Sequence, residues 1–97
     1  MIAITAKAKE KLEEILREET TDREKAMRIV TTTSSEKPLG FIVDEEEESD
    51  LVIESEEGRC VLLIGPGMGA ALEGTVLDYG ETEARRGFFV YKKTYIN

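Results

Sequence analysis

The chain has 97 residues, of which 40% are hydrophobic and 35% are charged, and its formal net charge is −8. This acidic balance disfavours binding to nucleic acid or to an anionic membrane surface, since both need clustered lysine and arginine. One cysteine excludes an internal disulfide, and the lack of histidine removes the commonest general base and metal ligand. We expect a single domain spanning residues 1–97. It should be cytoplasmic, since no apolar run is long enough to span a membrane and no signal peptide precedes the first charged residues.

The beginning of the chain predicts a short strand and an amphipathic helix. Ile2 and Ile4 can form an entry strand, and Thr5 is a good N-cap for a helix that runs to about Glu19. The residues at i, i+4, i+7 and i+8 along this helix form one apolar stripe: Ala8, Leu12, Ile15 and Leu16. We expect the helix to pack on a sheet through this stripe.

Short strands dominate the rest of the chain. Residues 27–33 are rich in β-branched side chains, and residues 39–43 place Leu39, Phe41 and Val43 on one face. Further strands are predicted over 51–53, 59–64, 75–79 and 87–91, with a short helix that begins at Pro66 and stops before Gly74. Because few helices separate the strands, we expect a β-rich α+β fold, a compact sandwich or pseudo-barrel of mainly antiparallel strands.

Two polar segments resemble ligand loops but lack essential features. The acidic run at 44–50 has neither the alternating ligands nor the glycine of a calcium loop, so we interpret it as a solvated loop. The glycine-rich segment 65–69 lacks the Lys-Ser/Thr pair of a phosphate loop. We interpret it as a turn from strand to helix.

Several segments match a known pattern in order and spacing. They are Ile4-Thr5 with the helical stripe, Met27-Arg28-Ile29, GFIVD at 40–44, the acidic loop with Asp50, Gly58 with the following strand, LEGTVLDY at 72–79, and Gly87-Phe88. Together they resemble the A-type iron–sulfur carrier family, also called the HesB/IscA-like domain. The resemblance implies a small β-rich domain that often self-associates, binds iron or a cluster, and passes it to recipient proteins.

The cysteine ligands of that family are missing here. The family ligates through one cysteine in the loop after the first long strand and a Cys-x-Cys pair near the C-terminus. Ser35 or Glu36 stands at the first position, and the sequence has no C-terminal pair. Thiolates match cluster iron far better than hydroxyl or carboxylate oxygens do. No catalytic, cofactor-binding or metal-binding residue is therefore assigned, and no cofactor is expected.

The single cysteine, Cys60, lies in the most apolar run of the chain. Alternation places Cys60, Leu62 and Ile64 on one face and Arg59 on the other. We therefore predict that Cys60 is a small buried hydrophobe.

These observations favour a protein that is not an enzyme. We expect a member of the carrier family that lacks cluster binding and acts as an adaptor or regulator, with protein partners in iron–sulfur assembly or sulfur metabolism. A homodimer is one possible state. The alternative is an iron or hard-metal binder that uses carboxylates such as Glu36, Asp44 and Glu45. Catalysis is disfavoured because Ser34, Ser35 and Cys60 have no evident base partner.

Overall fold

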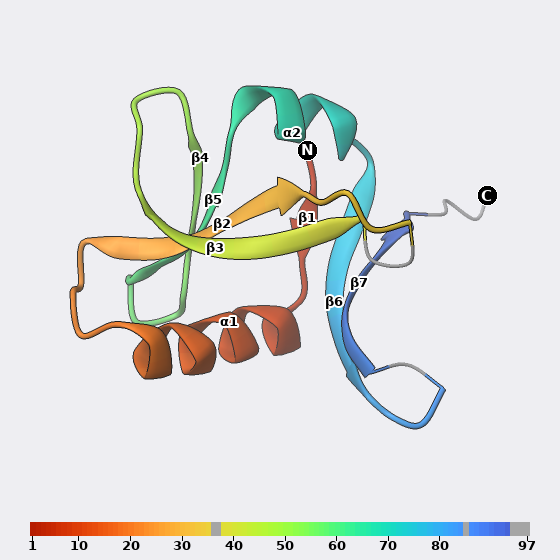
Figure 1. Ribbon diagram of the computed structural model, residues 1–97, viewed down its shortest axis with the longest axis horizontal. Coiled ribbons are helices and arrows are strands. Elements are labelled where there is room, and N and C mark those ends of the chain that lie inside the picture. The colour runs from red at the N-terminus through yellow and green to blue at the C-terminus, as the bar shows by residue number, and fades with distance from the viewer. Residues whose placement is uncertain (36–37, 85, 94–97) are drawn as a thin grey trace.

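A computed structural model describes residues 1–35, 38–84 and 86–93, which form two sheets and two helices (Figure 1). In chain order the elements are β1 (Ala3–Ile4), α1 (Ala6–Glu19), β2 (Lys25–Thr31), β3 (Leu39–Glu45), β4 (Leu51–Glu54), β5 (Cys60–Ile64), α2 (Pro66–Ala71), β6 (Thr75–Glu81) and β7 (Arg86–Lys92). Within the described ranges, no helix has the length and apolar character needed to cross a bilayer. The β-rich α+β class predicted from the sequence is confirmed.

The larger sheet has the strand order β3-β2-β5-β4, and the smaller sheet has the order β1-β6-β7. Antiparallel pairing joins β2 to β3, β4 to β5 and β6 to β7. Parallel pairing joins β2 to β5 and β1 to β6. The sheets are therefore mixed: the antiparallel hairpins were expected, whereas the two parallel pairs depend on long-range contacts that the sequence pattern does not show.

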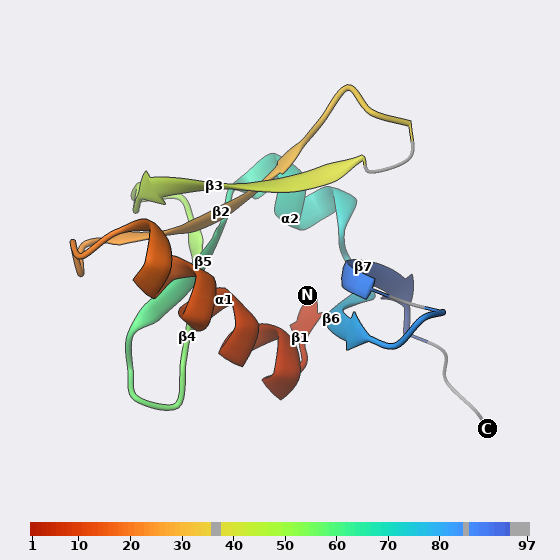
Figure 2. The same cartoon turned by 60° about the horizontal axis from the view of Figure 1, so that its bottom comes forward.

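Helix α1 begins as predicted. The Thr5 hydroxyl oxygen accepts a hydrogen bond of 3.1 Å from the Ala8 N–H, and the hydroxyl donates to the Asp78 carboxylate at 2.7 Å. Ala8, Leu12 and Leu16 are fully buried where α1 packs against β5 and β6. Figure 1 shows α1 lying beneath the larger sheet, and Figure 2 shows the smaller sheet at the N-terminal end of α1.

Strand β5 forms the centre of the core. Four consecutive residues of this strand, Val61 to Ile64, are at most 1% exposed. A strand buried on both faces needs a continuous apolar run, which is the pattern that predicted it. The glycine-rich turn is also confirmed, since Pro66 begins the short helix α2 directly after Gly65.

The strands extend further than the sequence pattern indicated. Strand β2 begins at Lys25, and the antiparallel ladder of β6 and β7 continues through Gly80 paired with Gly87 to Glu81 paired with Arg86. Gly87 has φ +88°, a backbone conformation that residues with a side chain rarely adopt. The residues between the strands predicted over 75–79 and 87–91 are therefore strand at both ends, at Gly80, Glu81 and Arg86.

Candidate functional site

An apolar groove separates the edges of the two sheets. Strand β3 ends the larger sheet and β7 ends the smaller one. The groove between them has a volume of about 490 Å³, and its apolar lining includes Leu39, Phe41, Leu77, Phe88 and Val90. A concave apolar surface of this size is the commonest form of a binding site for a small molecule or a peptide side chain.

Aromatic rings form the floor of this groove and join the two sheets. The ring centroids of Phe41 on β3 and Phe88 on β7 lie 4.8 Å apart, and Tyr79 on β6 meets Phe88 edge-on at the same distance. A second hollow of about 440 Å³ shares Phe41 and Phe88 and continues past Ile15 to Val43. The two hollows therefore form one continuous surface along β3.

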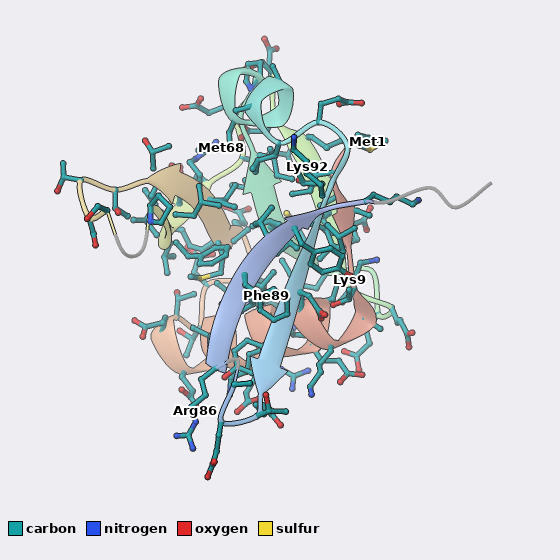
Figure 3. The ribbon with its side chains drawn as sticks, turned by 90° about the vertical axis from the view of Figure 1, so that its right-hand side faces the viewer. Met1, Lys9, Met68, Arg86, Phe89 and Lys92 are labelled. Atoms are coloured by element: carbon teal, nitrogen blue, oxygen red, sulfur yellow. The ribbon has the colours of Figure 1, made fainter. Side chains whose placement is uncertain are left out.

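The opposite face of β7 carries a second aromatic pair. Phe89 and Tyr91 lie 5.9 Å apart, and Tyr91 is 43% exposed. Figure 3 shows Phe89 midway along β7, with Arg86 and Lys92 at the two ends of the strand. Alternation thus places Phe88 and Val90 on one side of β7 and Phe89 and Tyr91 on the other, although Phe89 also lines part of the groove.

The loop that follows β3 is acidic, and an ion-pair cluster holds it in place. Glu45 to Glu48 are exposed. Two hydrogen bonds of 2.7 and 2.6 Å run from the Arg28 guanidinium to the Asp50 carboxylate, and Arg28 Nε donates to Asp44 at 2.7 Å. The prediction of a wholly solvated loop is wrong for Asp50, whose side chain is 1% exposed. Arg28 on β2 compensates for the burial of the Asp50 carboxylate, because it supplies the opposite charge and two hydrogen bonds.

This cluster shifts the pKa values of its members. The hydrogen bonds from Arg28 lower the pKa of Asp50, and the backbone N–H of Glu45 together with Arg28 lowers that of Asp44. The two carboxylates raise the pKa of Arg28 further above its already high value. All three groups are therefore charged at neutral pH.

The carboxylates considered as metal ligands are not brought together as a free set. Asp44 is paired with Arg28, Glu45 is paired with Lys25 at 2.7 Å, and Glu36 lies outside the described residues. In the described segments, no three cysteine, aspartate or glutamate residues are grouped so that they could hold a metal ion. Ser34 and Ser35 are exposed in the loop after β2.

Cys60 lies at the margin of the core rather than within it. It is half-buried at the start of β5, opposite Glu54 and next to an irregularity in the β4–β5 register. The prediction of a small buried hydrophobe is therefore wrong in part: Cys60 is only half-buried and lies beside the register shift of the β4–β5 ladder. Burial raises the pKa of the Cys60 thiol, and the negative charge of Glu46 raises it further. A neutral thiol is a poor nucleophile and a poor metal ligand.

The groove could be anticipated only in part from the sequence. The two-residue period correctly placed Leu39, Phe41 and Val43 on one face of β3, where they line the two adjoining hollows. The same period in β7 would have placed Phe88 and Val90 on one face. Nothing in either segment shows that these faces meet, because that contact depends on how the two sheets pack.

Comparison with known proteins identifies the fold. No protein-family model and no curated protein sequence matches the chain. Among solved structures, Escherichia coli SufA, which is involved in the biosynthesis of iron–sulfur clusters, is similar over 94% of this chain and 79% of its own, with a TM-score of 0.63 and 17% identity. IscA, solved with a 2Fe–2S cluster, is similar over 95% of this chain and 85% of its own, with a TM-score of 0.64 and 21% identity.

A third structure extends this similarity. A protein from Aquifex aeolicus, solved by NMR in solution, is similar over 95% of this chain and 91% of its own, with a TM-score of 0.65 and 24% identity. The chain therefore has the HesB/IscA-like fold that its sequence resemblance implied.

Proposed function

We propose that this protein is a non-catalytic member of the A-type iron–sulfur carrier family that holds no stable cluster of its own. In this proposal it acts as an adaptor or regulator, with protein partners in iron–sulfur assembly or sulfur metabolism in the cytoplasm. The observation that carries the family assignment is a fold shared with SufA and IscA over 94–95% of the chain. The sequence matches from LEGTVLDY to Gly87-Phe88 support it independently of the fold.

The donor atoms available argue against cluster binding. Clusters are held by thiolates, usually four of them, and the sequence has one cysteine and no histidine. The raised pKa of Cys60 keeps its thiol protonated at neutral pH. Even two copies of the chain would supply only two thiols, so the remaining ligands would be oxygen atoms or small molecules that bind cluster iron weakly.

The carboxylate alternative has less support. An iron ion at Asp44 and Glu45 would have to displace Arg28 and Lys25, which already neutralise these carboxylates. Displacement would also disturb the Arg28 cluster that holds the acidic loop.

Anaerobic reconstitution with iron and sulfide, followed by desalting, tests the proposal. We expect colourless protein with no visible charge-transfer absorption and with little bound iron or sulfide, because the soft ligands are too few. The wild type and Cys60→Ser should behave alike. An established three-cysteine carrier prepared in parallel shows that the procedure loads a competent protein.

The contrary result is equally clear. Brown wild-type protein with stoichiometric iron and sulfide, together with colourless Cys60→Ser, would show a cluster held through Cys60. Iron retained without sulfide would instead favour the carboxylate alternative.

A further inference from the structure

The hydrogen-bond pattern of β3 shows which of its backbone groups are free. The Thr32 N–H donates to the Pro38 carbonyl at 2.8 Å, and this pair continues the register in which Thr31 faces Leu39. In an antiparallel ladder, bonded and non-bonded pairs alternate. Gly40 and Ile42 therefore bond to β2. The N–H and C=O groups of Leu39, Phe41 and Val43 point away from it.

Strand β7 has the same arrangement on its side of the groove. The Lys93 N–H donates to the Gly74 carbonyl at 3.0 Å, in the register that pairs Lys92 with Thr75. Alternation then directs the backbone groups of Phe88 and Val90 away from β6. Both strands end their sheets, and no described strand pairs with either free edge. The groove is thus bordered by two strand edges with unused donors and acceptors.

The side chains beside these free backbone groups are apolar. The residues with outward amides on β3 are also those whose side chains line the two hollows, and Val43 among them is 38% exposed. A strand added to β3 would therefore direct every second side chain into the groove. Leu39 to Val43 spans about 13 Å at roughly 3.3 Å per residue, which is enough for a five-residue segment.

Charge distinguishes the two ends of the surface along β3. Exposed Glu46 to Glu48 follow directly after the C-terminal end of β3. In antiparallel pairing, the N-terminal end of an incoming segment lies beside this acidic run. Lysine or arginine there would be attracted to it, whereas a second copy of the chain would bring a further net charge of −8.

We propose that the groove between β3 and β7 binds an extended segment of a basic partner protein. The segment adds antiparallel to the free edge of β3, places apolar side chains at alternate positions against Phe41 and Phe88, and places basic residues at its N-terminal end beside the acidic loop. This inference rests on the proposed function in that it gives the adaptor its partner surface. Its test uses no iron, so failure of one proposal is distinguishable from failure of the other.

A pair of labelled peptides tests the proposal by fluorescence anisotropy. The probe is Lys-Lys-Ser-Val-Thr-Val-Thr-Val-Ser, and the matched control carries the same palindromic core with the two lysines at its C-terminal end. We expect saturable binding of the probe and binding several-fold weaker for the control. Raising salt from about 50 to about 200 mM should weaken probe binding several-fold, since the charges are exposed.

Two variants of Val43 distinguish the contribution of its backbone N–H to peptide binding from that of its side-chain shape. Val43→Pro removes the outward N–H, and proline is tolerated on an edge where that group faces solvent. Val43→Thr keeps the N–H and the branched shape. We expect Val43→Pro to weaken probe binding about tenfold or more, and Val43→Thr to retain it. Circular dichroism and thermal melting establish that both variants are folded.

Three results of the binding measurements would overturn the proposal. They are no saturable binding of either peptide, equal binding of the two peptides, and probe binding by folded Val43→Pro at wild-type strength. Sedimentation of the wild type as a dimer that Val43→Pro converts to a monomer would also overturn it, by assigning this edge to a second copy of the chain.

Discussion

The Asp50 carboxylate is almost completely removed from water, yet every polar partner it needs is present. Arg28 donates two hydrogen bonds to it, and the Glu47 N–H donates a third at 2.8 Å. Arg28 itself is 13% exposed and also bonds Asp44 and the Glu45 carbonyl. A buried ion pair adds little stability over apolar residues of the same size, but loss of one partner leaves a buried charge unpaired. The pair therefore fixes where the acidic loop lies.

Removing the charge of Asp50 should destabilise the protein more than removing that of Asp44. We expect Asp50→Asn to lower the free energy of unfolding by about 1–3 kcal/mol, since Arg28 loses a charged partner in a buried setting. The matched variant Asp44→Asn should cost less, because the Asp44 side chain is 42% exposed. Urea denaturation of the three proteins measures this, and equal midpoints for both variants would contradict it.

Helix α1 illustrates how much an element depends on contacts distant in sequence. Its Thr5 cap bonds both to the helix and to Asp78 on β6, and its apolar stripe closes the core beneath β5. Leu12 and Leu16 are fully buried, whereas Ile15 on the same stripe is only partly buried. The side chains of the stripe should therefore contribute unequally to the free energy of unfolding.

Truncation of the stripe should reveal this difference. Leu12→Ala should lower the free energy of unfolding by about 2–5 kcal/mol, since it removes packed atoms from a fully buried site. Ile15→Ala is the matched control and should cost clearly less. Thermal and urea denaturation provide the comparison, and similar losses for both variants would mean that the Ile15 site is as tightly packed as that of Leu12.

Elements defined by local periodicity were predictable, and contacts between them were not. Thr5, the α1 stripe and the apolar run of β5 have short-range signals, and each was located correctly. The pairing of β2 with β5 and the burial of Asp50 depend on residues brought together from separate segments. For the candidate site, the sequence placed the β3 face but not the Phe88 ring that meets it, and it placed Cys60 too deep because a register shift has no local signature.

At the scale of the whole molecule, two electrostatic effects oppose each other as pH falls. The net charge of −8 at neutral pH means that the excess carboxylates repel one another, and their protonation relieves this repulsion. Against this, the pKa values of Asp50, Asp44 and Asp78 are lowered, the last by its hydrogen bond from Thr5. A carboxyl group whose pKa is lowered by folding stabilises the fold at any pH above its pKa in the unfolded chain. This stabilisation is lost as the pH falls through its pKa in the folded protein.

Stability should therefore decline steeply only in acid. We expect little loss from pH 7 to about pH 5 and a marked loss below about pH 4, where the three aspartates begin to protonate in the unfolded chain. Urea midpoints across this range measure the effect. Asp50→Asn should show a shallower acid decline than the wild type, and an unchanged decline would assign the acid sensitivity to other groups.

The smaller sheet joins the two ends of the chain, and this has a consequence for biosynthesis. Among the described strands, β1 pairs with β6 alone, and the Thr5 hydroxyl donates to Asp78, 73 positions later. A polypeptide that emerges from the ribosome N-terminus first can form α1 and its local Thr5 cap early, but neither the β1–β6 pairing nor the hydrogen bond from Thr5 to Asp78 can form until β6 has been translated. Such distant pairings close slowly because the intervening loop entropy must be lost first. Folding of this domain is therefore completed only after β6 and β7 have left the ribosome, and until then α1 lacks the packing that β6 provides.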